Sequence, residues 1–459
     1  MKFKQFMLAG LFFTMMTSCQ NELDENEVHG NEGDAYMSLS IEMPNVEGGR
    51  AIDENGTTSE GTAGEQKITS LKLFVYDATS GELQNSGNTD FDAGDLQLAD
   101  INKTTTYTIP SFKIKGGEKK VLVIVNPLDG KFTDQTDMSE AMKLSEDEIN
   151  AVSTDGKFMM TNVNREPDTD GMVSVIVDGT ETNPTSVTVE VERVVAKIED
   201  TTNNYEFSIA NTNGDKVVFQ KVALINGNTK FYPVMKVREN EKDKTNDYVE
   251  DPNFENQNEE TVNDFYSKVF TESTFNDTDN KYVKPLSSEE SEANALFYTL
   301  ENTMISNEQM NSYTTGLYYQ AQYKLGGQAG NVYKYGENLY TFDLLSNAAD
   351  GLGLQLGGLT NDSSVEEFAD IAVTKFVDGV CYYKYWIRHI DNPDAAMGAM
   401  EFAVVRNNHY LMNINSVKGI GENKPTDPDP TDPDENADSF LDVKVKVLPW
   451  VVRRNNIDF

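Results

Sequence analysis

The sequence predicts an all-β fold with two antiparallel β-sandwich domains in tandem. Apolar residues alternate with polar ones along several segments, which is the period of a half-buried strand. The 459 residues are enough for two core-forming domains. A polar stretch at 201–204 separates a first set of strands from a second, so we expect domains over 51–200 and 201–424.

The first set of strands is predicted at four places. Residues 37–43 and 71–76 alternate, and 121–125 is a continuous apolar run of the kind that is buried on both faces. The alternation over 187–191 continues to residue 196 as one apolar-rich segment. A short helix is expected over 145–152, where three acidic residues follow a serine.

The second half repeats this pattern around a long polar insertion. Strands are expected at 217–225, 296–300, 317–325, 380–389 and 410–417. Residues 239–280 are rich in Asp, Glu and Asn and poor in aliphatic residues, which predicts a long surface excursion, partly mobile.

The N-terminus predicts export. Lys2 and Lys4 precede an apolar stretch over 6–16 and then Cys19, which is typical of a secretory signal over 1–19. Cys19 is a candidate for lipidation, because a small residue precedes it and a polar, acidic tether follows. The precursor would then be an outer-membrane lipoprotein of a Gram-negative cell. The alternative is an ordinary signal peptide that is cleaved near the same place.

Charge and cysteine content narrow the functional classes. The chain has 38 Lys and Arg against 76 Asp and Glu, a formal net charge of −38. Such a surface repels phosphate backbones, so nucleic acid is excluded as a partner. Cys381 is the only other cysteine, and its strand-like neighbours predict a buried, inert thiol rather than a disulfide or a nucleophile.

The C-terminus predicts a tethered strand. Residues 425–439 alternate Pro with Asp and Thr, which predicts an extended linker of about 3.1 Å per residue, roughly 45 Å in all. The strand segment 440–459 follows and has no neighbour in sequence to pair with. The apolar residues of one face are Leu441, Val443, Val445 and Val447.

A lone arginine lies between the tether and the first domain. Arg50 follows two glycines and precedes Ala51, and the next arginine is Arg165. A glycine-flanked loop of this kind suits a trypsin-like protease. A cut after Arg50 would remove residues 20–50 as a propeptide. It would also release the first strand from its sheet. The apolar residues of that strand are Met37, Leu39, Ile41 and Met43.

Loss of the first strand would open a groove of unpaired backbone groups above an exposed core. The C-terminal strand of another copy fits it, because four apolar side chains at about 1.5–3 kcal/mol each give roughly 6–12 kcal/mol before entropy costs. Different donor and acceptor surfaces give an open, head-to-tail filament. The alternatives are that Arg50 is only a solvated charge and that the terminal strand folds back on its own domain.

Several segments, in order along nearly the whole chain, resemble the Bacteroidetes type V fimbrial subunits, most of all the shaft subunit of the short (minor) fimbria. They are the lipoprotein start, Arg50, residues 191–196 and 404–410, the Pro/Asp linker and the ending 445–450. The resemblance implies transthyretin-like sandwiches, an arginine-specific protease, strand exchange among copies, and anchor and tip subunits as partners. It also implies adhesion and biofilm formation by a surface filament. The region 240–280 matches poorly.

No catalytic site is predicted. His29 lies in the predicted propeptide, and His389 and His409 lack metal-ligand spacing. The glycines of 351–358 do not form a dinucleotide-binding fingerprint. We therefore expect no cofactor, no metal and no enzyme activity. The rival functions are a lipid-anchored adhesin or glycan-binding protein that never polymerises, and a minor or tip subunit of the same fimbria.

Overall fold

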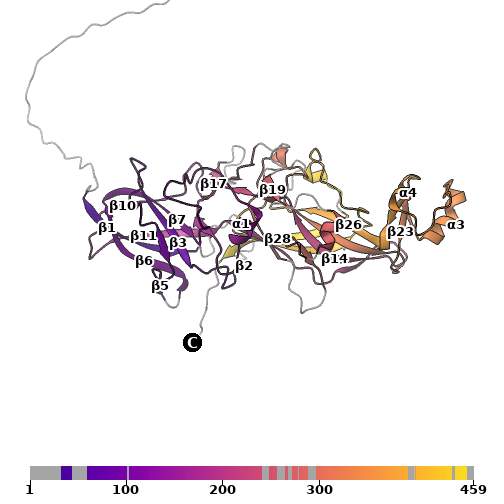
Figure 1. The fold of residues 1–459 in the computed structure, drawn as a ribbon, viewed down its shortest axis with the longest axis horizontal. Helices are drawn as coiled ribbons and strands as arrows, with labels where there is room; N and C mark the ends of the chain where they lie inside the picture. Colours follow the sequence, from indigo (N-terminus) through magenta and orange to yellow (C-terminus); the bar gives the residue numbers. More distant parts are fainter. Residues whose placement is uncertain are drawn as a thin grey trace, which may run out of the picture.

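The computed structural model describes residues 33–43, 59–100, 103–239, 248–255, 264–266, 271–277, 279–287, 296–390, 397–398, 400–436 and 440–451. The molecule is elongated and dominated by β-strands (Figure 1). The N-terminal half lies at one end, and helices α3 and α4 lie at the other. The all-β prediction is confirmed.

The N-terminal half is built around one nine-stranded sheet. Its order is β4-β3-β7-β9-β11-β1-β6-β5, and β10 pairs with β7. The run 121–125 ends β7 and is wholly buried, as its uninterrupted apolar sequence predicts. The strands are β1 (Asp34–Glu42), β3 (Ser70–Asp77), β4 (Asp90–Asp92), β5 (Gln97–Asp100), β6 (Lys103–Lys115), β7 (Gly117–Val125), β9 (Met160–Asn162), β10 (Val173–Val177) and β11 (Thr185–Arg193).

The C-terminal half has two five-stranded sheets. The first has the order β2-β28-β27-β12-β21; the second has the order β13-β14-β22-β26, and β20 pairs with β14. Asp200 links them, since its carboxylate accepts hydrogen bonds from Tyr319 (2.7 Å) and Tyr205 (3.0 Å). The strands are β2 (Ser59–Glu60), β12 (Val195–Asp200), β13 (Glu206–Ser208), β14 (Lys216–Ile225), β20 (Val283–Pro285), β21 (Leu296–Leu300), β22 (Gly316–Lys324), β26 (Val380–Trp386), β27 (Asn408–Val417) and β28 (Leu441–Val451).

The change from one half to the other falls at Val194, earlier than the predicted boundary after residue 200. The apolar segment 187–196 is two strands, because β11 ends at Arg193 in the first sheet and β12 begins at Val195 in another. Val194 is fully buried, and its N–H donates to the carbonyl of Met159. A continuous apolar run gives no local signal that its two ends join different sheets.

The two halves also share their largest core. One contiguous cluster of buried apolar residues extends from Met37 in β1 through Val195 to Leu441 in β28. The division into two domains stays a prediction, and the buried core is continuous across the junction between the halves. Contacts such as the edge-to-face pair of Phe158 and Tyr298 carry the core across it.

The acidic region 239–280 is not simply a surface excursion. In its described parts, β18 (Tyr248–Glu250) pairs with β17 (Lys236–Arg238), and α2 (Glu272–Asn276) packs on the second sheet. The reason is its few apolar residues, which are buried: Val249, Phe254, Phe265, Tyr266 and Phe275. Aromatic anchors spaced along a polar segment are enough to hold it against the core.

The helices follow local capping signals. The predicted helix over 145–152 is confirmed as α1 (Glu146–Ala151), with Ser145 and Glu148 forming a capping box. Two further helices, α3 (Phe342–Leu352) and α4 (Val365–Ala369), were not predicted. They form the far tip with β23 (Val332–Tyr335), β24 (Asn338–Tyr340) and β25 (Thr374–Phe376), which make a three-stranded sheet.

A buried ion pair supports the C-terminal half. Arg406 and Glu301 are both fully buried and form a two-pronged contact, in which Arg406 Nε donates to Glu301 Oε2 at 2.8 Å. Arg406 also donates to the carbonyls of Tyr232 (2.7 Å) and Pro233 (3.2 Å). Because these groups satisfy the guanidinium without water, removal of one partner leaves an unpaired buried charge.

We expect Glu301→Ala to lower the free energy of unfolding by about 3–5 kcal/mol, measured by urea denaturation. Glu190→Ala is the control: it breaks the half-exposed Arg165–Glu190 pair (2.8 Å) and should cost at most about 1 kcal/mol. Equal losses in the two variants would contradict a special role for the buried pair.

Candidate functional site

Strand β1 is the most deeply inserted terminal segment of the chain. It pairs in parallel with β11 and antiparallel with β6, so both of its backbone edges are bonded. Its inward side chains Met37, Leu39 and Ile41 are at most 1% exposed, and Met43 just beyond it is 6% exposed. The predicted strand over 37–43 is therefore confirmed, with its apolar face in the core.

The space that β1 fills between β6 and β11, called the slot below, has an apolar lining. On one side, Met37, Leu39 and Ile41 pair in register with Phe112, Ile109 and Tyr107 of β6. On the other side, Leu39 and Ile41 pair with Val187 and Val189 of β11. Burial of the four apolar side chains is worth about 6–12 kcal/mol before entropy costs. A chain without β1 would expose this surface together with two unpaired strand edges.

The C-terminal strand β28 lies on its own half of the molecule. It pairs antiparallel with β27 from Leu441 to Pro449. Among the described residues, only Ser59 and Glu60 of β2 pair with its other edge, at Trp450 and Val451. In this chain the strand folds back on its own half, the alternative that the sequence left open, and this pairing satisfies its backbone groups.

Burial differs sharply between the two terminal strands. On the predicted donor face of β28, Leu441 is buried at 2% exposure, while Val443 and Val445 are only partly buried. The backbone of Val447 pairs with Tyr410. Lys444 on the opposite face is exposed. The apolar face of the C-terminal strand is thus buried less completely than that of β1.

The Pro/Asp linker is docked rather than free. The hydroxyl of Ser312 donates to the carbonyl of Pro428 (2.8 Å), and the Asn311 amide donates to the Asp432 carboxylate (3.0 Å). The N–H of Thr426 donates to the hydroxyl of Tyr318 (3.1 Å). Proline has no backbone N–H, so this segment cannot pair as a regular strand. Its carbonyls and its Asp carboxylates still accept hydrogen bonds from the domain.

Asp434 is the buried end of this linker. Its side chain accepts a hydrogen bond from the Thr314 hydroxyl, and its N–H donates to the Gln309 carbonyl at 3.1 Å. Burial, reinforced by the nearby charge of Asp432, raises the pKa of Asp434 to about 8. The side chain is therefore mostly protonated in the docked linker near neutral pH.

Cys19, Arg50 and Ala51 lie outside the described residues. The sequence places Arg50 and Ala51 on the segment 44–58, which connects β1 to β2. The cleavage position predicted from sequence thus falls between the strand that fills the slot and the strand that touches the end of β28.

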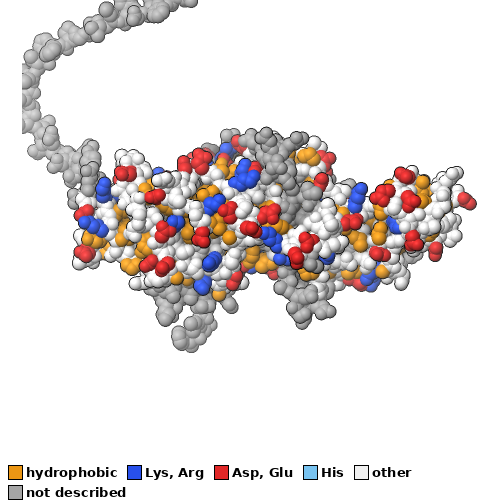
Figure 2. All heavy atoms as spheres, viewed as in Figure 1, with side chains coloured by type: hydrophobic (Ala, Val, Ile, Leu, Met, Phe, Trp, Pro, Cys, Tyr) orange, Lys and Arg blue, Asp and Glu red, His pale blue; other side chains and the backbone are white. Residues whose placement is uncertain are grey.

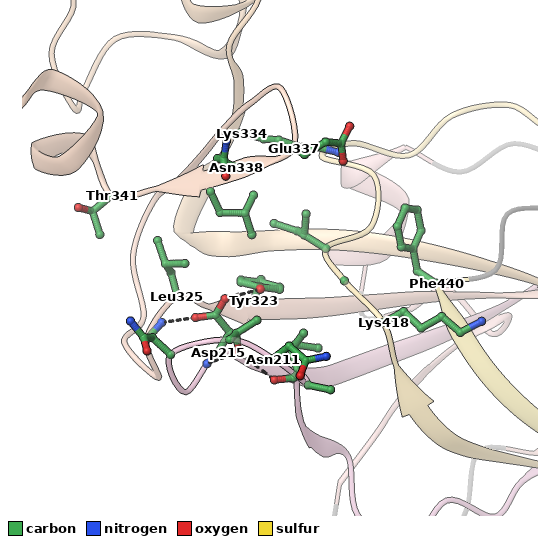
Figure 3. A pocket seen from close by; sticks show the side chains of 18 of the residues that line it. Asn211, Asp215, Tyr323, Leu325, Lys334, Glu337, Asn338, Thr341, Lys418 and Phe440 are labelled. Atoms are coloured by element: carbon green, nitrogen blue, oxygen red, sulfur yellow. Dashed lines mark hydrogen bonds between the residues drawn. The ribbon is translucent and has the colours of Figure 1, made fainter. Parts of the chain in front are cut away.

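A pocket lies beside the start of β28. Its volume is about 890 Å³, and Phe440, 43% exposed, stands at its edge (Figure 3). Asp215 is fixed within the lining by the hydroxyl of Tyr323 (2.6 Å) and the N–H of Gly326 (2.7 Å). These bonds hold a turn together and leave no free acid–base pair.

The described cysteine and histidine side chains that were considered for chemistry are buried within the fold. Burial raises the pKa of the Cys381 thiol to about 11, which matches the inert thiol predicted from sequence. His389 is buried and its Nδ1 lies 2.8 Å from the hydroxyl of Tyr410. In the part of the chain that the structure describes, no cluster of three or more His, Cys, Asp or Glu is arranged to hold a metal ion.

Sequence reasoning missed three features of this site. They are the docking of β28 on β27, the hydrogen bonds of the linker, and the short strand β2. The predicted strand over 410–417 did locate β27, but nothing local indicates that β28 pairs with it. The partners of the linker, such as Asn311 and Asp432, are 121 positions apart, so only the folded chain brings them together.

Two family models match the ends of the chain where the terminal strands lie. Residues 35–193 match the model described as major fimbrial subunit protein (FimA), and residues 374–456 match the C-terminal model of the type IV major fimbrial subunit protein, fimbrillin. The first match begins in β1 and ends with β11; the second includes β28. The chain is a fimbrial subunit. Fimbrial subunits are structural proteins, so this one is not an enzyme.

Several solved structures are similar to this fimbrial subunit at low sequence identity. A proposed cell adhesion protein from Parabacteroides distasonis is 14% identical with a TM-score of 0.50, covering 91% of this chain and 99% of its own. A fimbrilin from Porphyromonas gingivalis is 16% identical with a TM-score of 0.43, covering 93% and 99%. The tip fimbrial protein Mfa3 of the same organism is 15% identical with a TM-score of 0.41, covering 91% and 100%. No curated protein matches the sequence.

The family places the fimbrial subunit in a cell-surface fimbrium. Acidic side chains are spread along the visible face rather than gathered at one end, in keeping with the net charge of −38 (Figure 2). Within the described residues, no helix has the length and apolar character needed to span a membrane.

We expect the docked linker to loosen as pH rises. The folded pKa of Asp434, about 8, lies above its unfolded value of about 3.9. The contribution of its docking is therefore complete below about pH 4 and is lost progressively as pH rises through about 8. Hydrogen exchange of residues 425–436, corrected for intrinsic rates, should show greater protection at pH 5 than at pH 8. Asp434→Asn should flatten this difference, and an unchanged pH dependence in that variant would contradict it.

Proposed function

We propose that the protein is the shaft subunit of a short fimbria, exported as a lipoprotein on Cys19, cut after Arg50, and polymerised head-to-tail by strand exchange. The observation that carries this proposal is the contrast between the terminal strands. Strand β1 fills a fully buried slot from a position upstream of Arg50. Strand β28 is partly buried, and in the described residues it pairs along its length with β27 and at its end with β2.

The exchange is favourable once the slot is empty. On its own half, β28 pairs along one edge and touches β2 at the other. In the slot of a second copy, both edges would pair, with β6 and with β11. The side chains of Val443 and Val445 would pass from partial to full burial, which adds to the stability of the exchanged state.

The uncut chain protects itself from premature exchange. Strand β1 is part of the same polypeptide as its slot, so its effective concentration there far exceeds that of any donor from another molecule. Cutting after Arg50 ends this advantage, because the released strand can then dissociate and be diluted. The cut also separates the mature chain from the lipid on Cys19, so one event would free the subunit and open its slot.

The geometry of the two surfaces makes the product a filament. Donor and acceptor lie on different parts of the elongated molecule: β28 lies near the middle and β1 lies toward one end (Figure 1). A heterologous contact of this type repeats without closing. Undocking of the linker would supply the reach to a neighbour. A shaft subunit must both donate and accept, and this chain contains both elements; anchor and tip subunits would complete the fimbria.

A second function fits the docking of β28 on its own half. A lipid-anchored adhesin that never polymerises would keep this arrangement as its final state. Adhesion and biofilm formation suit either alternative, so the fate of β28 is what separates them.

Val445→Asp should abolish filaments and leave the monomer folded, because the carboxylate is tolerated at a partly buried position but not in a closed slot. Lys444→Asp is the matched control, since it places the same side chain on the exposed face of the strand. Negative-stain microscopy and circular dichroism are the measurements. Filaments of normal length from Val445→Asp would refute donation by β28, whereas a cut but otherwise unaltered protein that forms no filaments would favour the non-polymerising adhesin.

Arg50→Ala should leave the protein as an uncut, lipidated precursor, detected by intact mass and N-terminal sequencing of surface material. Arg50→Lys separates an arginine-specific protease, which should not process it, from a general trypsin-like one, which should. A mature chain that still begins at Ala51 in the Arg50→Ala variant would exclude an arginine-specific cut at this position.

A further inference from the structure

The end of β28 is secured by residues that follow the predicted cut. Ser59 and Glu60 of β2 pair in parallel with Trp450 and Val451. They are the only described residues bonded to that edge of the strand. A pairing of two residues is weak by itself. A fold that is never cut at Arg50 would not need such a pairing just downstream of that position.

A side-chain hydrogen bond reinforces this pairing from the far side of β28. The hydroxyl of Ser59, on β2, lies 2.6 Å from Nδ1 of His409, on β27. Because β28 lies between β2 and β27 in the sheet, this bonded pair spans it. Leu448 pairs with His409, projects on the same face and is buried there. The other nitrogen of His409, Nε2, lies 3.0 Å from the Glu199 carboxylate.

The chain beyond β2 is anchored by a separate buried network. The carboxylate of Glu65 accepts hydrogen bonds from Lys197 (2.9 Å) and Tyr298 (2.6 Å), and its carbonyl accepts one from Arg193 (2.9 Å). Burial alone would raise the pKa of Glu65, but hydrogen bonds from Tyr298 and Lys197 outweigh it and the pKa is lowered. This network fixes one side of β2. Upstream, β2 is connected in sequence through residues 44–58 to the inserted strand β1.

We propose that Ser59, Glu60 and His409 form a latch that keeps β28 on its own half until the chain is cut at Arg50. The proposal rests on the proposed strand exchange. In the uncut chain, β2 is held between two fixed points, β1 and Glu65, so little conformational entropy opposes its pairing with β28. A cut releases the upstream point, and the entropy regained by the free chain end weakens the latch. One cut would then act on both ends of the subunit, opening the slot and loosening the donor.

The test is hydrogen exchange of residues 441–451 in the purified protein before and after cutting at Arg50. Ser59→Ala removes the bond to His409 at a partly exposed position. It should speed exchange of β28 in the uncut chain by about two- to tenfold, the effect of one lost hydrogen bond, without changing exchange of β1. Cutting the unaltered protein should also speed exchange of β28, and Ser59→Ala should add less to the cut chain than to the uncut one. Ser86→Ala is the control, because its hydroxyl bonds Asp134 (2.8 Å) on the N-terminal half.

Equal exchange of β28 in cut and uncut protein, or in Ser59→Ala and unaltered protein, would overturn the latch. A disulfide lock separates this failure from failure of strand exchange. Leu411→Cys with Lys446→Cys joins cross-strand partners of β27 and β28. Under oxidation the cut, locked protein should form no filaments, and reduction should restore them. Filaments from the locked protein would refute donation by β28 itself. If the lock blocks assembly, donation by β28 is supported, and the hydrogen-exchange data then decide separately whether the latch exists.

Discussion

The structure depends on the burial of one terminal strand between two others. Strand β1 completes the sheet between β6 and β11, and its inward side chains form part of a core that continues into the C-terminal half. A segment with both edges paired and one face fully apolar cannot leave without exposing a large apolar surface. In the proposed strand exchange, the same groups that stabilise the monomer would bind the donor strand.

The second terminal strand satisfies the same rules less completely. Strand β28 must pair somewhere, because unpaired backbone groups are costly, and the edge of β27 accepts it. Its apolar face is only partly buried there, at Val443 and Val445, and the proposed exchange would bury that face more completely. In the proposed assembly, β28 would move from its place on β27 to the slot of another copy. The difference in burial between these two sites would set the direction of the exchange. No source of energy beyond binding is needed.

The junction between the halves combines several constraints. Val194 separates two sheets, Glu65 joins the segment after β2 to Lys197 and Tyr298, and the buried Arg406–Glu301 pair lies in the C-terminal half. Buried polar groups that are fully hydrogen-bonded are costly to rearrange. This part of the molecule therefore stays fixed while its two terminal strands differ in how firmly they are held.

The sequence by itself determined the all-β class, most strand positions and the alternation of the terminal strands, because a strand with one buried face records its burial in a two-residue period. It also determined the charge, the helix caps and the family resemblance. Tertiary structure alone decided where the run 187–196 divides, that aromatic residues hold the region around 248–277 against the core, and that the linker and β28 dock on their own half. Each of these depends on partners far apart in the chain, such as Asn311 with Asp432 and Ser59 with His409. A local sequence pattern specifies which face of a strand is apolar. Which segment pairs with that strand depends on the strand edges that remain unpaired once the rest of the chain has folded.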